Sequence, residues 1–260
     1  MVNTVGSYEN IHWQKKWKEI KRSAVLNLEQ RSLIIGSLLG DGTMRIGKGA
    51  VNANFKVEHG LEQKDYVLWK YRVLEPLVMT EPKISYRYTA DRQKYQKSWW
   101  FRTFRHPILT DIYKFFYIGS GYRTGRKIIP SNIQDYLDPL ALSVWIMDDG
   151  SYNKDKIDIS TYSFLFEEIE LLCRSLEKRY GLSAWYYKDR DKGYRMYFRK
   201  SVTGKLVDLI RPHIVTSMMY KIGFRNPVTT DPKGKIRPKD RTNNTPTLVI
   251  KQQAMEFPNS

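Results

Sequence analysis

Two short apolar stretches that each end in Asp-Gly constrain this sequence more than any other feature. They run from Leu33 to Gly42 and from Leu140 to Gly150, and Asp149 follows Asp41 by 149 − 41 = 108 residues, a domain-sized interval. Each stretch is long enough for a short helix and contains small residues at which two helices can approach closely: Gly36, Ser37 and Gly40 in the first, Ala141 and Ser143 in the second. We therefore expect the two helices to pack together and to bring Asp41 and Asp149 to the same end.

Both aspartates lie where a helix end disfavours negative charge. An aspartate in the last turn of a helix faces the negative end of the helix dipole, at a cost of up to about 1 kcal/mol. Two neighbouring carboxylates also repel each other unless a cation lies between them, and hard oxygen ligands select Mg²⁺. Such a pair is suited to metal-assisted hydrolysis of a phosphodiester. The alternative is that Asp-Gly merely forms a turn at each helix end. The matching surroundings of the two copies favour the metal site.

The order of predicted elements repeats along the chain. Residues 27–125 predict helix, hairpin, helix, hairpin, helix, and residues 126–225 predict the same order. The hairpin over residues 83–105 is expected to turn near Asp91. Residues expected at helix ends are Asn27 with Gln30, Asp65, His106-Pro107, Ser163, Gly181 and Ser201. Residues 1–26 are expected to form a polar, basic leader, and residues 226–260 an extended or disordered polar tail.

The charge balance indicates a polyanionic partner. The 260 residues include 44 Lys and Arg against 27 Asp and Glu, a net charge of +17, and such an excess causes self-repulsion in the folded state. Nucleic acid fits best, because no basic amphipathic helix dominates the chain and no apolar stretch approaches the roughly 20 residues of a membrane span. Charge does not separate DNA from RNA. The single cysteine, Cys173, excludes an intrachain disulfide and fits a reducing compartment.

The stretches 33–42 and 140–150 resemble the two signature helices of a single-chain LAGLIDADG homing endonuclease, and the resemblance extends over residues 27–225. It implies a mixed α/β fold of two pseudo-symmetric αββαββα repeats, with antiparallel DNA-binding sheets and the two motif helices packed at the centre. It also implies that Asp41 and Asp149 bind the catalytic metals, with Gly40 and Asp148 as their neighbours in the metal site. Val144 stands where a small residue is usual, which shifts the expected helix contact onto Ala141 and Ser143.

The resemblance further implies a basic residue beside each metal. Lys127 and Lys221 are the matching positions, and Arg126 is the alternative to Lys127. A lysine there could orient the attacking water or stabilise charge on the phosphate, although a lysine in so basic a chain is usually a solvated surface group. The expected cofactor is Mg²⁺, with Mn²⁺ able to substitute and Ca²⁺ supporting binding without cleavage. The four histidines are scattered and predict no histidine-based metal finger.

The predicted hairpins supply a surface for DNA. A two-stranded ribbon fits the major groove, where Arg and Lys pair with guanine edges, whereas basic residues at the rim hold phosphates. The aromatic residues interleaved with them (Tyr86, Tyr88, Trp99, Trp100, Tyr186 and Tyr194) are expected to pack between sheet and helix. The expected DNA-binding residues are Arg45, Lys48, Asn52, Asn54, Lys56, Arg87, Arg92, Lys94, Lys97, Arg102, Lys154, Lys156, Lys188, Arg190, Lys192, Arg195 and Arg199.

These features together predict a monomeric endonuclease that cuts both strands of a long, asymmetric double-stranded DNA site. By resemblance, cleavage across the minor groove leaves short 3′ overhangs. Two alternatives stay open: an RNA maturase that binds its host intron RNA, and a DNA-binding protein without catalysis. The presence of both aspartates argues for cleavage, because a protein that only binds has no need of them. The absence of a transit peptide fits an organelle-encoded or bacterial protein.

Overall fold

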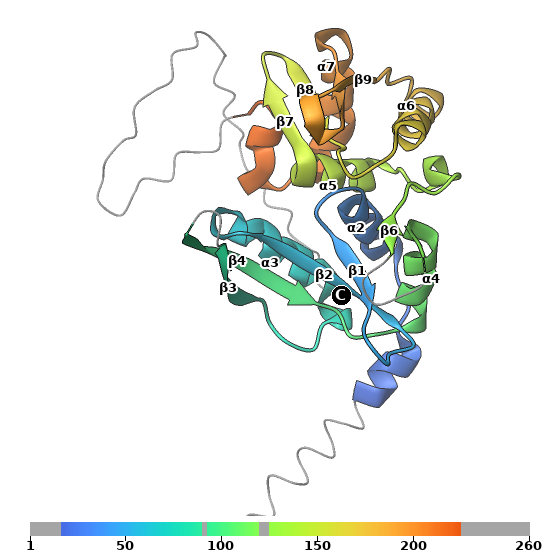
Figure 1. The fold of residues 1–260 in the computed structure, drawn as a ribbon, viewed down its shortest axis with the longest axis vertical. Helices are drawn as coiled ribbons and strands as arrows, with labels where there is room; N and C mark the ends of the chain where they lie inside the picture. Colours follow the sequence, from blue (N-terminus) through green and yellow to red (C-terminus); the bar gives the residue numbers. More distant parts are fainter. Residues whose placement is uncertain (1–16, 90–92, 120–124, 225–260) are drawn as a thin grey trace, which may run out of the picture. The chain divides into compact units, whose positions relative to one another are not determined.

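The computed structural model describes residues 17–89, 93–119 and 125–224, and within them one order of elements occurs twice (Figure 1). The first repeat contains α2 (Leu28–Leu39), β1 (Thr43–Ile46), β2 (Ala53–Gly60), α3 (Lys64–Leu74), β3 (Lys83–Thr89), β4 (Lys94–Arg102) and α4 (Pro107–Phe116). The second contains α5 (Pro139–Asp149), β7 (Gly150–Asn153), β8 (Lys156–Ser160), α6 (Phe166–Tyr180), β9 (Trp185–Lys188), β10 (Tyr194–Phe198) and α7 (Lys200–Ile210). The predicted mixed fold with antiparallel sheets is confirmed.

Shorter elements connect these. Strands β5 (Tyr117–Ile118) and β6 (Arg126–Lys127) pair with each other between the repeats. The 3₁₀ segments are Leu61–Gln63, Glu75–Leu77, Ile133–Asp135, Arg190–Lys192, Arg211–His213 and Thr216–Ile222. No helix in the described ranges is long and apolar enough to cross a membrane.

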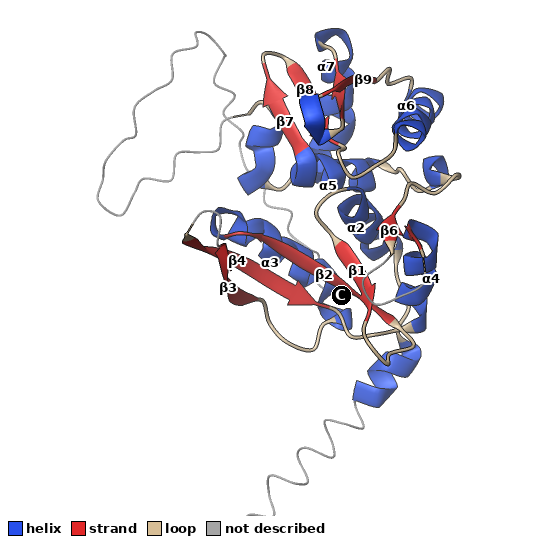
Figure 2. Cartoon of the chain, in the orientation of Figure 1, coloured by secondary structure: helices blue, strands red, loops and turns tan. Residues whose placement is uncertain are grey.

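The two sheets have the same topology, β1-β2-β4-β3 and β7-β8-β10-β9, and every strand pair in them is antiparallel (Figure 2). Alternation along the strands gives each sheet an inner face that packs on its helices and an outer face. Helices α3 and α4 contact the first sheet, and α6 and α7 contact the second. The buried inner-face residues include Met44, Phe55, Val57 and Phe101 in the first sheet, and Ile157, Ile159, Met196 and Phe198 in the second.

The helices α2 and α5 pack against each other at Gly36. A β-carbon at residue 36 would lie 2.3 Å from the carbonyl oxygen of Ala141 and 2.7 Å from the β-carbon of Val144. The expected contact at Ala141 is therefore present. The expectation for Ser143 was wrong, because its Oγ lies within hydrogen-bond distance of the carbonyls of Pro139 (2.6 Å) and Ile210 (3.1 Å), and Val144 itself lies at the helix contact. Glycine at 36 accommodates the larger Val144.

Replacing Gly36 with alanine should destabilise the fold by about 1–3 kcal/mol, because the added methyl group would overpack the contact between α2 and α5. Gly204, in α7, is the matched control: its substituent would meet nothing within 4 Å, so Gly204→Ala should raise stability by about 0.5–1 kcal/mol. Urea unfolding of both variants measures the difference. Equal effects of the two substitutions would contradict close packing at Gly36.

Three of the six predicted helix ends are confirmed. Asn27 and Gln30 form the expected reciprocal cap of α2, with hydrogen bonds of 2.8 and 3.2 Å. His106 caps α4, and Gly181 ends α6 in the left-handed conformation with φ of 58°.

Three caps differ from prediction. The cap of α3 is Gln63 rather than Asp65, and α7 begins at Lys200, before Ser201. At α6 the cap is Leu165 rather than Ser163, because the Glu168 carboxylate accepts from the Leu165 amide at 2.7 Å. Residues 17–23 are helical, and Trp17 and Ile20 pack on the core, so the packed fold begins before residue 27. Asp91 and the predicted tail lie outside the described residues.

Candidate active site

The ends of α2 and α5 meet at three aspartates. A β-carbon at Gly40 would lie 2.5 Å from the β-carbon of Asp148, and the Asp41 amide donates to Asp148 Oδ2 at 3.3 Å. The pKa of Asp149 is raised to about 8, mainly because the carboxyl is buried and also because Asp41 and Asp148 are negatively charged. The predicted convergence of the two Asp-Gly helix ends is therefore present, with negative charge concentrated at one point.

Two lysines lie against these helix ends in matching positions. Lys127 Nζ donates to the carbonyls of Gly40 (2.9 Å) and Gly42 (3.0 Å), the residues on either side of Asp41. Lys221 Nζ donates to the carbonyls of Asp148 (3.1 Å) and Gly150 (2.8 Å), on either side of Asp149. A cation at a helix C-terminus is favourable, since the last carbonyls there lack helical partners. Burial lowers the pKa of both lysines, and the nearby aspartates oppose that shift.

Arg126 does not share the position of Lys127. Its guanidinium forms a salt bridge with Glu168 of α6, with Nη1 2.9 Å from Oε2. The structure therefore places Lys127, and not the alternative Arg126, beside Asp41.

Asp148 is fully engaged by groups from the first repeat. Lys70 Nζ donates to both of its carboxylate oxygens, at 2.8 and 3.1 Å, and the Tyr66 hydroxyl donates to Oδ1 at 2.7 Å. The side chains of Lys70 and Asp148 are both 0% exposed. Asp148 therefore lies next to Asp41 and Asp149, and its carboxylate is held by the side chains of Tyr66 and Lys70.

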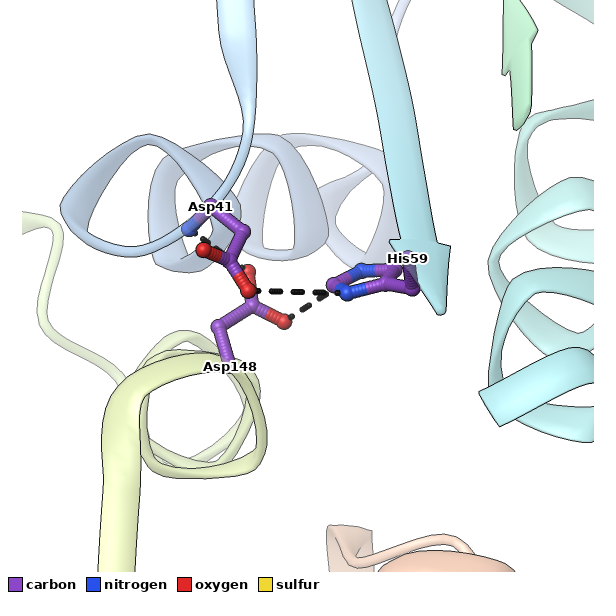
Figure 3. A group of neighbouring side chains, drawn as sticks. All are labelled: Asp41, His59 and Asp148. Carbon is purple, nitrogen blue, oxygen red and sulfur yellow. Dashed lines mark hydrogen bonds and ion pairs between the residues drawn. The ribbon is translucent and has the colours of Figure 1, made fainter. Parts of the chain in front are cut away.

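The side chain of His59 lies next to the carboxylates of Asp41 and Asp148 (Figure 3). Its Nδ1 lies 3.5 Å from Asp41 Oδ2, and its Nε2 lies 3.7 Å from Asp148 Oδ1. Ligand atoms of Asp41, His59 and Asp148 lie within 4.8 Å of one another, as in a site able to hold a metal ion. Burial alone would raise the pKa of Asp41, but hydrogen bonding to His59 and the nearby positive charges lower it.

Sequence reasoning missed His59, Tyr66 and Lys70. One signal was available: Lys70 lies on the apolar side of α3, four residues after Tyr66 and four before Leu74, both fully buried. A lysine in such a stripe requires a buried anion. His59 similarly follows Phe55 and Val57 on the inner face of β2.

The outer face of the first sheet holds five of the ten DNA-binding residues predicted in the first repeat. Strand register places Arg45, Asn54, Lys56, Arg87 and Arg102 on this face. Lys97 lies on the inner face, with its ammonium 5.3 Å from the Tyr86 ring centre. Lys48 and Asn52 lie in the β1–β2 turn, and Lys94 pairs in register with Thr89. Arg92 is outside the described residues.

The outer face of the second sheet is more aromatic. Lys156 and Arg195 lie on it together with Trp185, Tyr187 and Tyr197, which sequence reasoning did not select. Arg195 Nη2 donates to Ser151 Oγ at 2.8 Å, and Arg199 lies 4.2 Å from the Trp185 ring centre. Lys188 lies on the inner face. Of the remaining predicted residues, Lys154 lies in the β7–β8 turn, and Arg190 and Lys192 lie in the 3₁₀ segment between β9 and β10.

The predicted packing role of the hairpin aromatics is confirmed only in part. Tyr186 and Tyr194 pack on Phe166 of α6, each with ring centres 5.2 Å apart. Tyr86 and Tyr88 are instead 62% and 53% exposed. Trp100 lies on the outer face, 5.3 Å from the Lys56 ammonium, because its strand position alternates with Phe101.

Comparisons with known proteins identify a family and a fold. A model of the LAGLIDADG DNA endonuclease family matches residues 31–206. The chain is 30% identical over 214 residues to cytochrome b mRNA maturase bI2 of Debaryomyces hansenii, covering 78% of this chain and 79% of the relative. It is also 30% identical over 212 residues to DNA endonuclease I-ChuI of Chlamydomonas applanata, covering 77% and 97%. The solved structure of homing endonuclease I-WcaI bound to its DNA recognition sequence has a similar fold, with a TM-score of 0.72 at 24% identity, covering 80% of this chain and 92% of that chain.

Proposed function

Because the chain belongs to the LAGLIDADG DNA endonuclease family, we propose that it is a homing endonuclease that hydrolyses both strands of a long, asymmetric duplex DNA site with a divalent metal ion. The observation that carries this proposal is the pair of motif helices whose ends converge at Asp41 and Asp149, each flanked by a lysine on the adjoining carbonyls. Residues 27–125 and 126–225 would each supply one half of the enzyme.

Asp41 and Asp149 would hold the metal ions, with Gly40 and Asp148 adjoining them. Bound Mg²⁺, or Mn²⁺ in its place, supplies charge stabilisation at the phosphate and an activated water, whereas Ca²⁺ would support binding alone. Lys127 and Lys221 each use two of their three N–H groups on the carbonyls beside an aspartate. The third N–H can donate to a water or to a phosphate oxygen, where charge develops during hydrolysis.

The outer faces of the two sheets would bind the duplex. Residues on the strands, such as Arg45, Lys56, Arg102 and Arg195, would reach base edges, while Lys154 and other residues between strands would hold phosphates. The two outer faces differ in chemistry, so one chain acting as a monomer would recognise an asymmetric target. Cleavage is proposed to leave short 3′ overhangs.

Mg²⁺ affinity should rise with pH. Because burial and the charges of Asp41 and Asp148 raise the pKa of Asp149 to about 8, this carboxyl keeps its proton at neutral pH, and a metal must displace it. Below about pH 8 the apparent affinity should therefore increase by about tenfold per pH unit. Thermal unfolding of the wild type with increasing Mg²⁺, between about pH 6 and about pH 8, measures this. Asp149→Asn should lack the slope, and a wild-type affinity independent of pH would contradict the prediction.

An RNA maturase is the second candidate function, favoured by the similarity to a cytochrome b mRNA maturase. DNA cleavage and RNA binding differ in whether they require a metal ion at the site. Cleavage requires the cation-binding carboxylates at Asp41 and Asp149, whereas binding to a host intron RNA does not. Non-catalytic DNA binding would likewise be indifferent to metal.

Cleavage of a randomised duplex library decides among these functions. The full chain is incubated with Mg²⁺, with EDTA, or as Asp149→Asn, and the cut ends are sequenced. We expect metal-dependent cutting of the wild type at one long motif. Absence of cutting together with tight binding to a structured intron RNA would replace the endonuclease with the maturase. Equal DNA binding in Mg²⁺ and EDTA without any nick would indicate a regulator.

A further inference from the structure

The imidazole of His59 lies beside one of the two metal-binding aspartates. It comes from the inner face of β2 and its side chain is 2% exposed. Figure 3 shows its ring directed at the carboxylates of Asp41 and Asp148. Its ring centre also lies 5.0 Å from that of Tyr66, so packing as well as hydrogen bonding fixes the orientation of the ring.

The buried ammonium of Lys70 determines which nitrogen of His59 carries the proton. Lys70 Nζ lies 3.2 Å from His59 Nε2 and 2.8 and 3.1 Å from the two oxygens of Asp148. An ammonium has three N–H donors and no acceptor, so these three neighbours must all accept. His59 Nε2 is therefore the unprotonated nitrogen. The proton lies on Nδ1, which faces Asp41 Oδ2 at 3.5 Å.

This tautomer distinguishes two roles for His59. To bind a metal beside Asp41, Nδ1 would need a free lone pair and Nε2 would carry the proton. That proton would point at the Lys70 ammonium, which has no acceptor to offer. The geometry therefore favours a donor to the Asp41 carboxylate over a metal ligand.

The second repeat has different residues in the corresponding places. His59 lies five residues before the start of α3, and Thr161 lies five residues before the start of α6. The Thr161 hydroxyl donates to the carbonyl of Tyr194 at 2.8 Å. Lys70 and Leu172 are each the seventh residue of their helices, so an apolar side chain replaces the ammonium in the second repeat.

We propose that His59 is a positioning residue for Asp41, which it holds through Nδ1–H while Lys70 fixes its tautomer, and that this makes the two metal sites unequal. The inference rests on the proposed endonuclease function. The Asp41 carboxylate is oriented before metal binds, whereas Asp149 is next to no matching imidazole among the described residues. Loss of His59 therefore impairs one metal site and slows hydrolysis of one DNA strand more than the other.

Strand-specific cleavage by the full chain tests this inference. A duplex carrying the target found in the library, with a different label on each strand, gives both rates in one reaction. His59→Leu should slow one strand by about 10- to 100-fold, the usual effect of removing a residue that orients a metal ligand, and nicked duplex should accumulate. His59→Asn, whose amide nitrogen takes the place of Nδ1, should restore most of the lost rate, whereas His59→Gln should not. Thr161→Val is the matched control from the second repeat and should keep the wild-type ratio of strand rates.

Mn²⁺ binding to the protein without DNA gives a second readout. Free Mn²⁺ measured by electron paramagnetic resonance should show weaker binding at one site in His59→Leu and His59→Gln, and near-wild-type binding in His59→Asn. Two results would overturn the inference, provided that the wild type cuts DNA. One is a His59→Leu variant with the wild-type ratio of strand rates, and the other is equal activity of His59→Asn and His59→Gln. If the wild type cuts no DNA, the proposed function fails, and the Mn²⁺ titration still decides the role of His59. Should His59→Leu not fold, the Asn and Gln variants make the same comparison.

Discussion

Asparagine at either Asp41 or Asp149 should abolish double-strand cleavage while leaving DNA affinity largely intact. Asparagine keeps the shape of the side chain but removes the negative charge that a divalent cation needs. Metal-ion catalysis supplies several kcal/mol of charge stabilisation, and about 1.4 kcal/mol corresponds to tenfold in rate, so we expect losses of about a thousandfold or more. Affinity should stay level or rise slightly, because an acidic group is removed near the phosphates. Single-turnover cleavage and gel-shift titrations measure the two effects.

Stability measurements in EDTA separate loss of the metal ligand from general damage at the site. The pKa of Asp149 is raised from an ordinary 3.8 to about 8, so the folded protein retains a proton that the unfolded chain releases within this window. Its contribution to stability therefore falls as pH rises from about 4 to about 8. Asp149→Asn should consequently be more stable than the wild type at about pH 8.

Asp41 should behave in the opposite way. Its pKa is lowered against the effect of burial, by His59 and the nearby positive charges, so its ionised form stabilises the fold at neutral pH. Asp41→Asn should therefore be less stable than the wild type while losing cleavage to a similar extent. Full cleavage activity in either variant would contradict the metal assignment. Activity losses that track stability would contradict it as well.

The sequence was most informative where local patterns repeat. Two Asp-Gly helix ends in matching surroundings predicted the convergence of Asp41 and Asp149, and the family resemblance placed Lys127 and Lys221. The two aspartates lie at the ends of helices that the apolar pattern of the sequence defines, whereas Lys127 and Lys221 lie in a two-residue strand and a 3₁₀ segment that the pattern did not predict. Capping residues such as Asn27 were predictable for the same reason, since a cap and its helix are adjacent in the chain.

The features that were not predicted from the sequence depend on contacts between segments that are distant in the chain. The cluster of His59, Lys70 and Asp148 joins β2 and α3 of the first repeat to α5 of the second. The position of Lys70 on the apolar side of α3 indicates a buried anion, but α3 alone does not show that the anion is Asp148 of α5. The contact of Gly36 with Val144 likewise depends on how two helices meet. The small residues predicted that α2 and α5 would be in contact, but not that Val144 of α5 would lie at the contact.

Lys70→Met should destabilise the protein by about 3–5 kcal/mol, the usual cost of leaving a buried charge without its partner. Lys70 and Asp148 are both fully buried, and Asp148 would retain the Tyr66 hydroxyl but lose its counter-charge. Because the pair joins α3 of the first repeat to α5 of the second, the loss should appear in the unfolding of both repeats together. Urea unfolding followed by fluorescence measures the change.

A double-mutant cycle then isolates the charge pair. The second repeat has Leu172 where the first has Lys70, and Gly40 precedes Asp41 as Asp148 precedes Asp149. An uncharged pair is therefore compatible with this architecture, and replacing a buried ion pair by apolar groups is often neutral. Lys70→Leu combined with Asp148→Ala should recover most of the stability that Lys70→Leu alone loses. If the double variant instead shows the sum of the two single losses, the two side chains act independently and the pair does not couple the repeats.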